Sequence, residues 1–325
     1  MVTTVGIAGA SGKLGRLVAA ALLRLPSPPT LRLYVRDASK LPSWLSSSPH
    51  TVITGGADDR AATVEFARGC NVVICTYLGP DALMEEGQKV LIDACAEAGV
   101  PRYVASDYTV DYRPLKDGEL FPKDPMRHVM AYCNDKAGVE GVHVMIGAFM
   151  DTWWSGFFGA WVPDESGKGG KLRYWGSGDE AWEVSSYENT AEWIARVAVD
   201  GEAKGVEKFL GDRKNIHQIA AAMSSVYSFT PSLEPLGSLA DLHATMHQKR
   251  DSEPENYYAY LPMWYQYYML NGSTLLVPPG SSAEKELSNN RYPDVKAVTF
   301  EDYLRMYSPK ELSGAMMGIG EKAGK

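Results

Sequence analysis

Three glycines, Gly9, Gly12 and Gly15, stand three residues apart between an apolar segment that ends at Ala8 and an apolar segment that begins at Leu14. Glycines allow a tight turn and bring backbone amides close to a bound pyrophosphate, and the N-terminus of the following helix adds partial positive charge. A strand–turn–helix context makes this spacing a dinucleotide signature. The residues expected to contact the dinucleotide are Gly9, Ser11, Gly12, Lys13, Leu14 and Gly15.

The choice of dinucleotide depends on the end of the next strand, about 20 residues beyond the turn. An acid there would accept hydrogen bonds from the ribose of NAD, whereas an arginine forms charge-assisted bonds to a 2′-phosphate. Arg36 comes first after the apolar run, Asp37 follows, and Lys40 offers a second cation. The sequence therefore favours NADP(H), and Asp37 keeps NAD as the alternative.

Strand-like and helix-like segments alternate through the first 150 residues, which is typical of a parallel sheet covered by helices on both faces. Strands are expected at Val5–Ala8, Leu31–Val35, Thr51–Thr54, Val72–Thr76, Tyr103–Ala105 and Val142–Ile146, and the clearest helices at Leu14–Leu25 and Ala82–Ala98. We predict an α/β class fold with a doubly wound parallel Rossmann sheet. Such sheets bind ligands beyond the carboxyl ends of their strands. The residues expected there are Thr76, Tyr77, Leu78, Ser106, Asp107, Tyr108, Gly147, Ala148 and Phe149, with Asp58 after the third strand.

The pattern changes after Gly147. Trp153 and Trp154 open a run of aromatics, a glycine-rich hairpin region follows at 166–178, and helices are expected near 190–199, near 216–227 and from Leu239. We predict an NAD(P)-binding Rossmann domain over residues 1–150 and a smaller, aromatic-rich substrate lobe over 151–325 that packs on the first domain and is not independent.

The segment 255–270 is the most aromatic in the chain. Tyr257, Trp264 and Tyr265 fall at helical spacing, which is typical of an amphipathic helix packing its apolar face. Seven aromatics, six of them with polar tips, also suit a pocket for a flat hydrophobic molecule. Tyr108, Trp153, Trp154, Tyr257, Trp264 and Tyr265 are therefore the predicted substrate contacts.

The charge balance and the cysteines limit the classes of partner. A net charge of −8 over 325 residues disfavours a nucleic-acid binder, which would show a basic face. The N-terminal segment does not resemble a signal peptide, and no apolar run is long enough to span a bilayer. Four cysteines without CxxC spacing indicate reduced thiols in a cytoplasmic protein, and the histidines lack a metal-binding spacing. We expect no bound metal, no membrane, and a monomer or homodimer.

Several further motifs resemble the NmrA-like and isoflavone-reductase-like group of atypical short-chain dehydrogenases. They are Gly9-Ala10-Ser11-Gly12, Val35-Arg36-Asp37, Gly55-Gly56-Ala57-Asp58-Asp59, Gly147-Ala148-Phe149-Met150, Tyr174-Trp175-Gly176-Ser177-Gly178, Gly237-Ser238-Leu239-Ala240-Asp241-Leu242 and Thr299-Phe300-Glu301-Asp302-Tyr303-Leu304. This resemblance covers nearly the whole chain. It implies that the ends of the fourth, fifth and sixth strands line the nicotinamide pocket.

A reductase of this group needs a proton donor, and plant members use a lysine early in the helix before the sixth strand. The corresponding position lies within about one residue of Arg127, so that lysine is absent there and His128 becomes a candidate because its pKa suits proton transfer. Tyr132 and Lys136 fit the YxxxK of classical short-chain dehydrogenases, but close to the end of a helix. Asp107 follows the fifth strand and would need a raised pKa to act as an acid.

These features lead to one expected function and two alternatives. The leading hypothesis is an NADPH-dependent reductase of an aromatic or polycyclic small molecule of the enone, quinone or imine type. One alternative is an NADP(H)-sensing regulatory protein of the NmrA kind with a protein partner. The other is an enzyme that keeps the cofactor as a scaffold for non-redox cyclisation.

Overall fold

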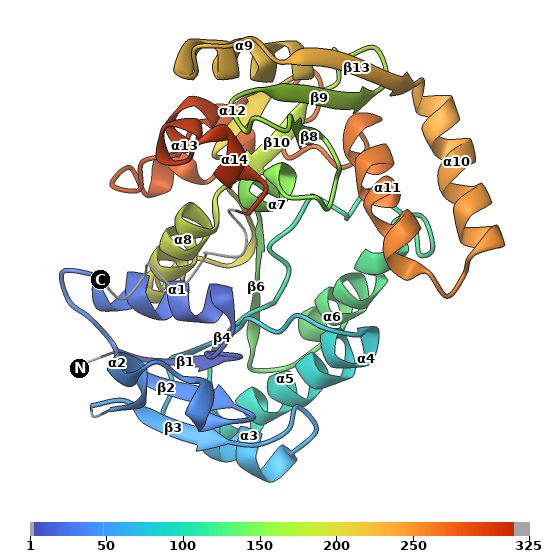
Figure 1. The fold of residues 1–325 in the computed structure, drawn as a ribbon. Coiled ribbons are helices and arrows are strands. Elements are labelled where there is room, and N and C mark those ends of the chain that lie inside the picture. The colour runs from blue at the N-terminus through green and yellow to red at the C-terminus, as the bar shows by residue number, and fades with distance from the viewer. Residues whose placement is uncertain (1–2, 48, 315–325) are drawn as a thin grey trace.

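The computed structural model describes residues 3–47 and 49–314, and its main element is a seven-stranded parallel sheet (Figure 1). The strand order is β11-β6-β5-β4-β1-β2-β3. The strands are β1 (Thr4–Ala8), β2 (Thr30–Val35), β3 (Thr51–Thr54), β4 (Val72–Cys75), β5 (Arg102–Val104), β6 (Glu140–Met145) and β11 (Gly205–Lys208). The order reverses beside β1, which is the arrangement of dinucleotide-binding sheets. The predicted Rossmann fold is confirmed.

Helices cover both faces of this sheet. On one face α1 (Lys13–Leu23) packs against α8 (Tyr187–Val199), and on the other lie α3 (Arg60–Ala67), α5 (Glu86–Ala98) and α6 (Asp124–Asn134). Shorter turns join them: η1 (Ala38–Lys40), α2 (Ser43–Ser46), α4 (Asp81–Met84) and η2 (Phe121–Lys123). The helix expected over Ala82–Ala98 is interrupted at Glu85, which separates α4 from α5 and has φ of −104° and ψ of −71°. The two faces bury separate apolar clusters, one around Val18 and Ile194 and one around Phe66 and Leu91.

The second lobe contains two small sheets. One has the order β12-β10-β7 and the other β13-β9-β8. Their strands are β7 (Ala148–Phe149), β8 (Trp161–Pro163), β9 (Gly170–Trp175), β10 (Trp182–Ser185), β12 (Asp212–Lys214) and β13 (Ser232–Gly237). β8 pairs antiparallel with β9, so the predicted hairpin region 166–178 contains the turn and the second strand of a hairpin that begins earlier, at Trp161.

Helices surround these sheets and enclose a third apolar cluster, around Trp153, Trp161 and Phe300. They are α7 (Met150–Trp154), α9 (Ile216–Val226), α10 (Leu239–Ser252), α11 (Tyr257–Leu270), α12 (Ala283–Glu286), η3 (Asn289–Arg291), α13 (Phe300–Met306) and α14 (Pro309–Leu312). Figure 1 shows α10 and α11 as an antiparallel pair on one side of the lobe, and the N-terminal end of α11 packs on η2, just before α6. The most aromatic segment of the sequence is therefore a helix at the junction of the two lobes.

Two elements from the second half of the chain belong to the first lobe. β11 pairs in parallel with β6 and becomes an edge of the main sheet, and α8 packs on α1. Both elements come from beyond residue 150, the boundary that the sequence predicts, so the N-terminal unit is completed by later residues. The predicted second lobe also includes residues 315–325, which lie outside the described residues. Within the described part of the chain, no helix combines the length and apolarity needed to cross a membrane.

Candidate functional site

The glycine turn between β1 and α1 leaves no room for side chains. Gly9 has φ of +84°, and a Cβ atom on Gly15 would lie 2.5 Å from the carbonyl oxygen of Gly9. The Gly12 amide closes the turn by donating to the Gly9 carbonyl over 2.9 Å. Gly12 is also the N-cap of α1, where no side chain of the described residues caps the helix and the first turn carries no acid. Such a helix end is suited to an anionic diphosphate.

Thr76, which follows β4, holds this turn in position. Its backbone N–H and its hydroxyl both donate to the Ala8 carbonyl oxygen over 2.9 Å. A Cβ atom on Gly9 would come within 2.9 Å of the Thr76 hydroxyl oxygen. The structure therefore brings the predicted cofactor residues Gly9, Gly15 and Thr76 into one close-packed cradle.

The end of β2 presents cations to solvent. Arg36 and Lys40 are exposed, and neither is more than a few residues beyond β2. The Asp37 carboxylate accepts from the Ser39 amide over 2.9 Å and from the Ser39 hydroxyl over 2.7 Å, and these bonds lower the pKa of Asp37. Because that carboxylate already caps η1, it is a poorer acceptor for a ribose hydroxyl than an unengaged acid would be.

The neighbouring Tyr77 provides a second observation at this edge. Its side chain is buried and its hydroxyl has no hydrogen-bond partner among the described residues. Burial raises the pKa of Tyr77, and the Arg36 guanidinium opposes part of this effect, which places the two groups near each other. A buried hydroxyl without a partner is costly unless a ligand or water completes it. Asp58, the other acid predicted here, is exposed.

The loops after β4 and β5 are joined by side-chain hydrogen bonds. Ser106 donates its hydroxyl hydrogen to the Tyr77 carbonyl over 2.7 Å, and its amide donates to Gln88 over 2.9 Å. Tyr108 has φ of +38° and donates its hydroxyl hydrogen to the Cys75 carbonyl over 2.8 Å. Leu78, in contrast, is 86% exposed. Hydrogen bonds therefore join the predicted residues after β5 to the end of β4 and the loop that follows it. Tyr108 is buried at the end of β4.

Asp107 is the centre of a buried polar network. Its Oδ1 accepts from the Tyr112 hydroxyl over 2.8 Å, and its Oδ2 lies 2.7 Å from Nδ1 of His143 on β6. All three residues are at most 5% exposed. Both carboxylate oxygens therefore have partners, and the carboxylate also favours the Nδ1–H tautomer of His143.

Lys123 is a site residue that the sequence reasoning did not select. It ends η2, immediately before α6, and is 8% exposed. Its Nζ lies 5.3 Å from the centroid of the Tyr265 ring on α11. Burial lowers the pKa of Lys123 to about 8, and the negative charge of Asp107 opposes this shift. The signal in the sequence was a lysine directly after the apolar run Leu120-Phe121-Pro122.

The other proton-donor candidates lie along α6. His128 places Nδ1 2.8 Å from Glu85 Oε2, and this hydrogen bond raises the pKa of His128. Tyr132 donates to Asp93 on α5 over 2.6 Å, and Lys136 binds the same carboxylate. The structure thus directs His128 and Tyr132 toward α4 and α5, apart from the Asp107 network. Arg127 is bound to Asp117 over 2.9 Å.

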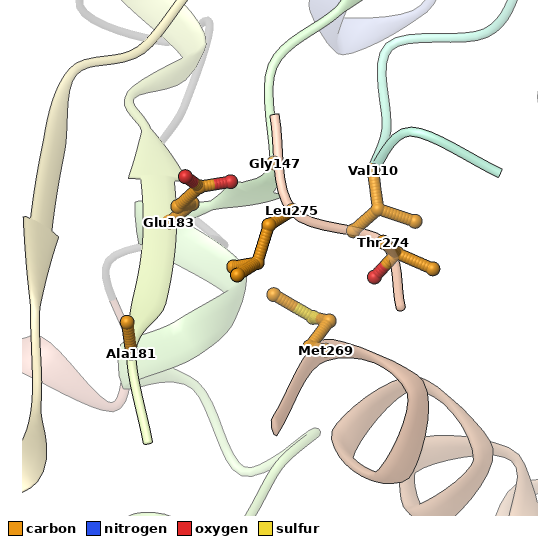
Figure 2. A pocket seen from close by; sticks show the side chains of 7 residues that line it. All are labelled: Val110, Gly147, Ala181, Glu183, Met269, Thr274 and Leu275. Carbon is orange, nitrogen blue, oxygen red and sulfur yellow. The ribbon is translucent and has the colours of Figure 1, made fainter. Parts of the chain in front are cut away.

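A small cavity lies beyond the ends of β5 and β6 and under α11 (Figure 2). Its lining residues are Val110, Gly147, Ala181, Glu183, Met269, Thr274 and Leu275. Glu183 is buried, and its carboxylate accepts from the Leu276 amide over 2.5 Å and from the Val277 amide over 3.3 Å. Burial raises the pKa of Glu183. This acid fixes the segment that closes the cavity, and the predicted residue Gly147 forms part of the wall.

The aromatic residues predicted to contact substrate divide into two groups. Trp153 and Trp154 are fully buried, with ring centroids 4.6 Å apart, inside the core of the second lobe. Tyr257 and Trp264 pack on Phe121 of η2, with centroid distances of 5.9 and 5.4 Å. Phe149, predicted on the cofactor side, stacks on Tyr187 at 3.8 Å. The burial of Trp153 and Trp154 is therefore explained by core packing. Tyr265 differs from them because it lies beside Lys123.

Comparisons with known proteins agree with this geometry. Residues 9–146 match a family model described as NAD(P)H-binding, which confirms the predicted nicotinamide dinucleotide domain. No curated protein sequence matches the chain.

Solved structures share the fold of nearly the whole chain. AtPrR2 with NADP+ and (+)pinoresinol is 18% identical, with a TM-score of 0.78 over 94% of this chain and 99% of that one. An isoflavone reductase is also 18% identical, with a TM-score of 0.73 and the same coverage. The NADPH-dependent quinone oxidoreductase QOR2 from Escherichia coli, complexed with NADPH, is 19% identical, with a TM-score of 0.71 over 92% of this chain and 98% of that one. The resemblance drawn from sequence motifs is thus matched at the level of the fold.

Proposed function

Because the chain carries an NAD(P)H-binding domain within the fold of the isoflavone reductase structure, we propose that it is an NADPH-dependent reductase of an aromatic or polycyclic small molecule. The observation that carries this proposal is the glycine turn after β1, which lies within the residues that match the NAD(P)H-binding model and at the carboxyl edge of the parallel sheet. The small cavity beyond the ends of β5 and β6 lies at the same edge. Substrate and cofactor would therefore meet where open α/β sheets bind their ligands.

The cofactor side supports NADPH over NADH. The amides at the start of α1 would hold the diphosphate, and Arg36 with Lys40 would bind the 2′-phosphate. Asp37 is engaged by Ser39 and does not compete for the ribose. Bound NADPH supplies hydride chemistry, and the protein contributes orientation and electrostatics.

The substrate side supports a flat and largely apolar molecule. Tyr265 from α11, Met269 one turn later and the exposed Leu78 all come from elements that border the strand ends. Pockets for such ligands are mostly apolar, with a few polar groups that fix orientation. Enones, quinones and imines with aromatic rings have this character, and each accepts a hydride at carbon.

A reductase of this kind also needs a proton for the atom that becomes negatively charged. His128, Tyr132 and Asp107 remain our proposed donors. Because the Asp107 oxygens both accept hydrogen bonds, Asp107 can donate only after losing one of these bonds. His128 has a raised pKa and a partly exposed ring, which leaves it protonated over a wider pH range.

The proposal is tested by mixing the purified chain with NADPH and a panel of aromatic quinones, enones and imines. We expect cofactor oxidation that depends on one class of the panel, with the reduced product identified by mass spectrometry. NADPH that binds tightly yet is not consumed with any class would contradict the reductase. That result would favour the sensor or the non-redox enzyme, which a partner pull-down and a product analysis without cofactor turnover would separate.

A further inference from the structure

The described residues bury seven charged side chains, and six of them have a charged or hydrogen-bonding partner. The seven are Asp107, Asp111, Lys123, Asp151, Glu183, Glu207 and Lys208. The two lysines show the contrast most clearly. Lys208 binds Glu286 over 2.8 Å and donates to the Leu276 carbonyl over 2.8 Å. Lys123 has neither a hydrogen bond nor an ion pair within residues 3–47 and 49–314, and its Nζ lies 5.3 Å from the centroid of the Tyr265 ring.

Two acids lie near Lys123 in space or in the chain. Asp107 attracts the ammonium electrostatically, but its oxygens accept from Tyr112 and His143. Asp124, the next residue in the chain, accepts from the Gly118 amide through Oδ2 over 2.9 Å, and its Oδ1 has no partner among the described residues, yet Asp124 does not contribute to the pKa of Lys123. Tyr265 presents a ring face, and burial raises the pKa of its hydroxyl above the ordinary value. The ammonium of this largely buried side chain thus has three N–H donors and no acceptor among the described residues.

Buried charges in proteins are paired, because removing an unpaired ammonium from water is costly. With a pKa of about 8, Lys123 is still mostly protonated at pH 7, so burial does not relieve this cost by neutralising the amine. Lys123 lies beside Tyr265 of α11, and Tyr265 is one helical turn from the cavity residue Met269. The missing acceptor is therefore one that a ligand in this region can bring.

We propose that Lys123 binds an anionic oxygen group, a carboxylate or phenolate, of the aromatic ligand that enters beneath α11. The ring of that ligand would lie against Tyr265, and its oxygen anion would complete the hydrogen bonds of the ammonium. This inference rests on the proposed function, which gives the position of the aromatic ligand. It adds that the ligand carries a negative charge. It requires binding only and no hydride transfer.

The test is calorimetry on the full chain saturated with NADP+, using naphthalene-2-carboxylate and its neutral match, naphthalene-2-carboxamide. At pH 8 about half of the Lys123 side chains are neutral, so binding a carboxylate draws up to about half a proton per site from the buffer. Titrations in two buffers of different ionisation enthalpy measure this uptake. We expect uptake at pH 8 that shrinks toward about a tenth of a proton at pH 7. The phenol 2-naphthol, bound as phenolate, would instead release protons, which distinguishes the two anions.

Substitutions at Lys123 assign the effect. Lys123→Met should weaken the carboxylate at least tenfold, leave the carboxamide unchanged and abolish the proton uptake. Lys123→Arg should restore part of the affinity without any uptake, because arginine stays protonated at pH 8. Lys116→Met, at an exposed lysine seven residues earlier, should behave like the original chain.

Two results would overturn the proposal. One is equal affinity for the carboxylate and the carboxamide without proton exchange for the carboxylate or the phenol. The other is an anion preference that persists in folded Lys123→Met. Neither depends on turnover, so a chain that binds anions through Lys123 but consumes no NADPH would contradict the reductase and leave this inference standing.

Discussion

The cofactor turn and the region under α11 are built in opposite ways. The turn uses contiguous residues, from Gly9 to Gly15, and it presents backbone amides rather than side chains. The region under α11 gathers side chains from separate segments, among them Lys123, His143, Glu183 and Tyr265. A local backbone motif is recognisable in one sequence, whereas a pocket of distant side chains is visible only after folding. Variants that act on one region and spare the other would sharpen this contrast.

The largest effect is expected from Gly15→Ala. A Cβ atom there would lie 2.5 Å from the Gly9 carbonyl oxygen and 2.9 Å from Ala10 Cα, so the turn must open. Overpacking of this kind costs about 1–3 kcal/mol, and we expect the upper end, near a hundredfold loss of affinity for NADPH and NADH alike. Calorimetry measures both. Gly201→Ala, at an exposed glycine whose Cβ would meet no atom within 4 Å, is the matched control. Unchanged NADPH affinity in Gly15→Ala would place the dinucleotide elsewhere.

A smaller and selective effect is expected from Arg36→Ala. Removing a charged hydrogen bond to the 2′-phosphate should cost about 1.5–3 kcal/mol of NADPH binding and leave NADH nearly unchanged. Fluorescence titration of the two cofactors gives the ratio. Arg24→Ala, at an exposed arginine at the far end of α1, should alter neither affinity. Equal weakening of NADPH and NADH, or tighter binding of NADH by the original chain, would refute the preference for NADPH.

The proton donor is tested next, in single-turnover reactions with a substrate found in the panel. His128→Ala, Tyr132→Phe and Asp107→Asn should be compared, and the donor should slow hydride transfer at least about tenfold, roughly 1.4 kcal/mol, with cofactor affinity unchanged. For His128 the activity should persist to a higher pH than an ordinary histidine allows, since the hydrogen bond to Glu85 raises its pKa. If none of the three variants is slowed, all three assignments fail.

The smallest effect concerns stability of the second lobe. Asp151 on α7 is fully buried, and burial raises its pKa to about 7. The folded chain therefore binds a proton between pH 4 and 7 that the unfolded chain has released, and the stability falls as the pH rises through this range. Asp151→Asn should remove this slope and raise the free energy of unfolding at pH 8 by about 1 kcal/mol, since the lost acceptor for Tyr303 or Tyr187 offsets part of the relief.

Urea denaturation at pH 5 and pH 8 measures that change. Asp179→Asn, at an exposed aspartate in the same lobe, should leave the pH dependence as it is. If the stability of Asp151→Asn still falls between pH 5 and pH 8, another titrating group causes the pH dependence.

The sequence by itself determined the sheet and its cofactor turn. The six predicted strands were within two residues of the observed ones, and the Thr51–Thr54 strand matched at both ends, because a short apolar run bounded by turns or helices is typical of a buried strand. The seventh strand of the sheet, β11, was not predicted. The turn was predictable because glycine spacing acts on the backbone of neighbouring residues. The interruption at Glu85 was not predicted, because no proline marks it and the spacing of apolar residues continues through the segment 82–98.

Only the tertiary structure decided the environment of the polar residues. Asp107, His143 and Tyr112 are separated by up to 36 residues, and their contact depends on the pairing of β5 with β6. Nothing in the sequence separates Lys123 from the other lysines. In the folded chain it is buried, and its Nζ lies near Tyr265 of α11. Trp153 and Trp154 were predicted to contact substrate, but both are fully buried in the apolar core of the second lobe. Burial depends on which distant segments meet, and in this chain β11 and α8 return across the lobes to complete the first unit.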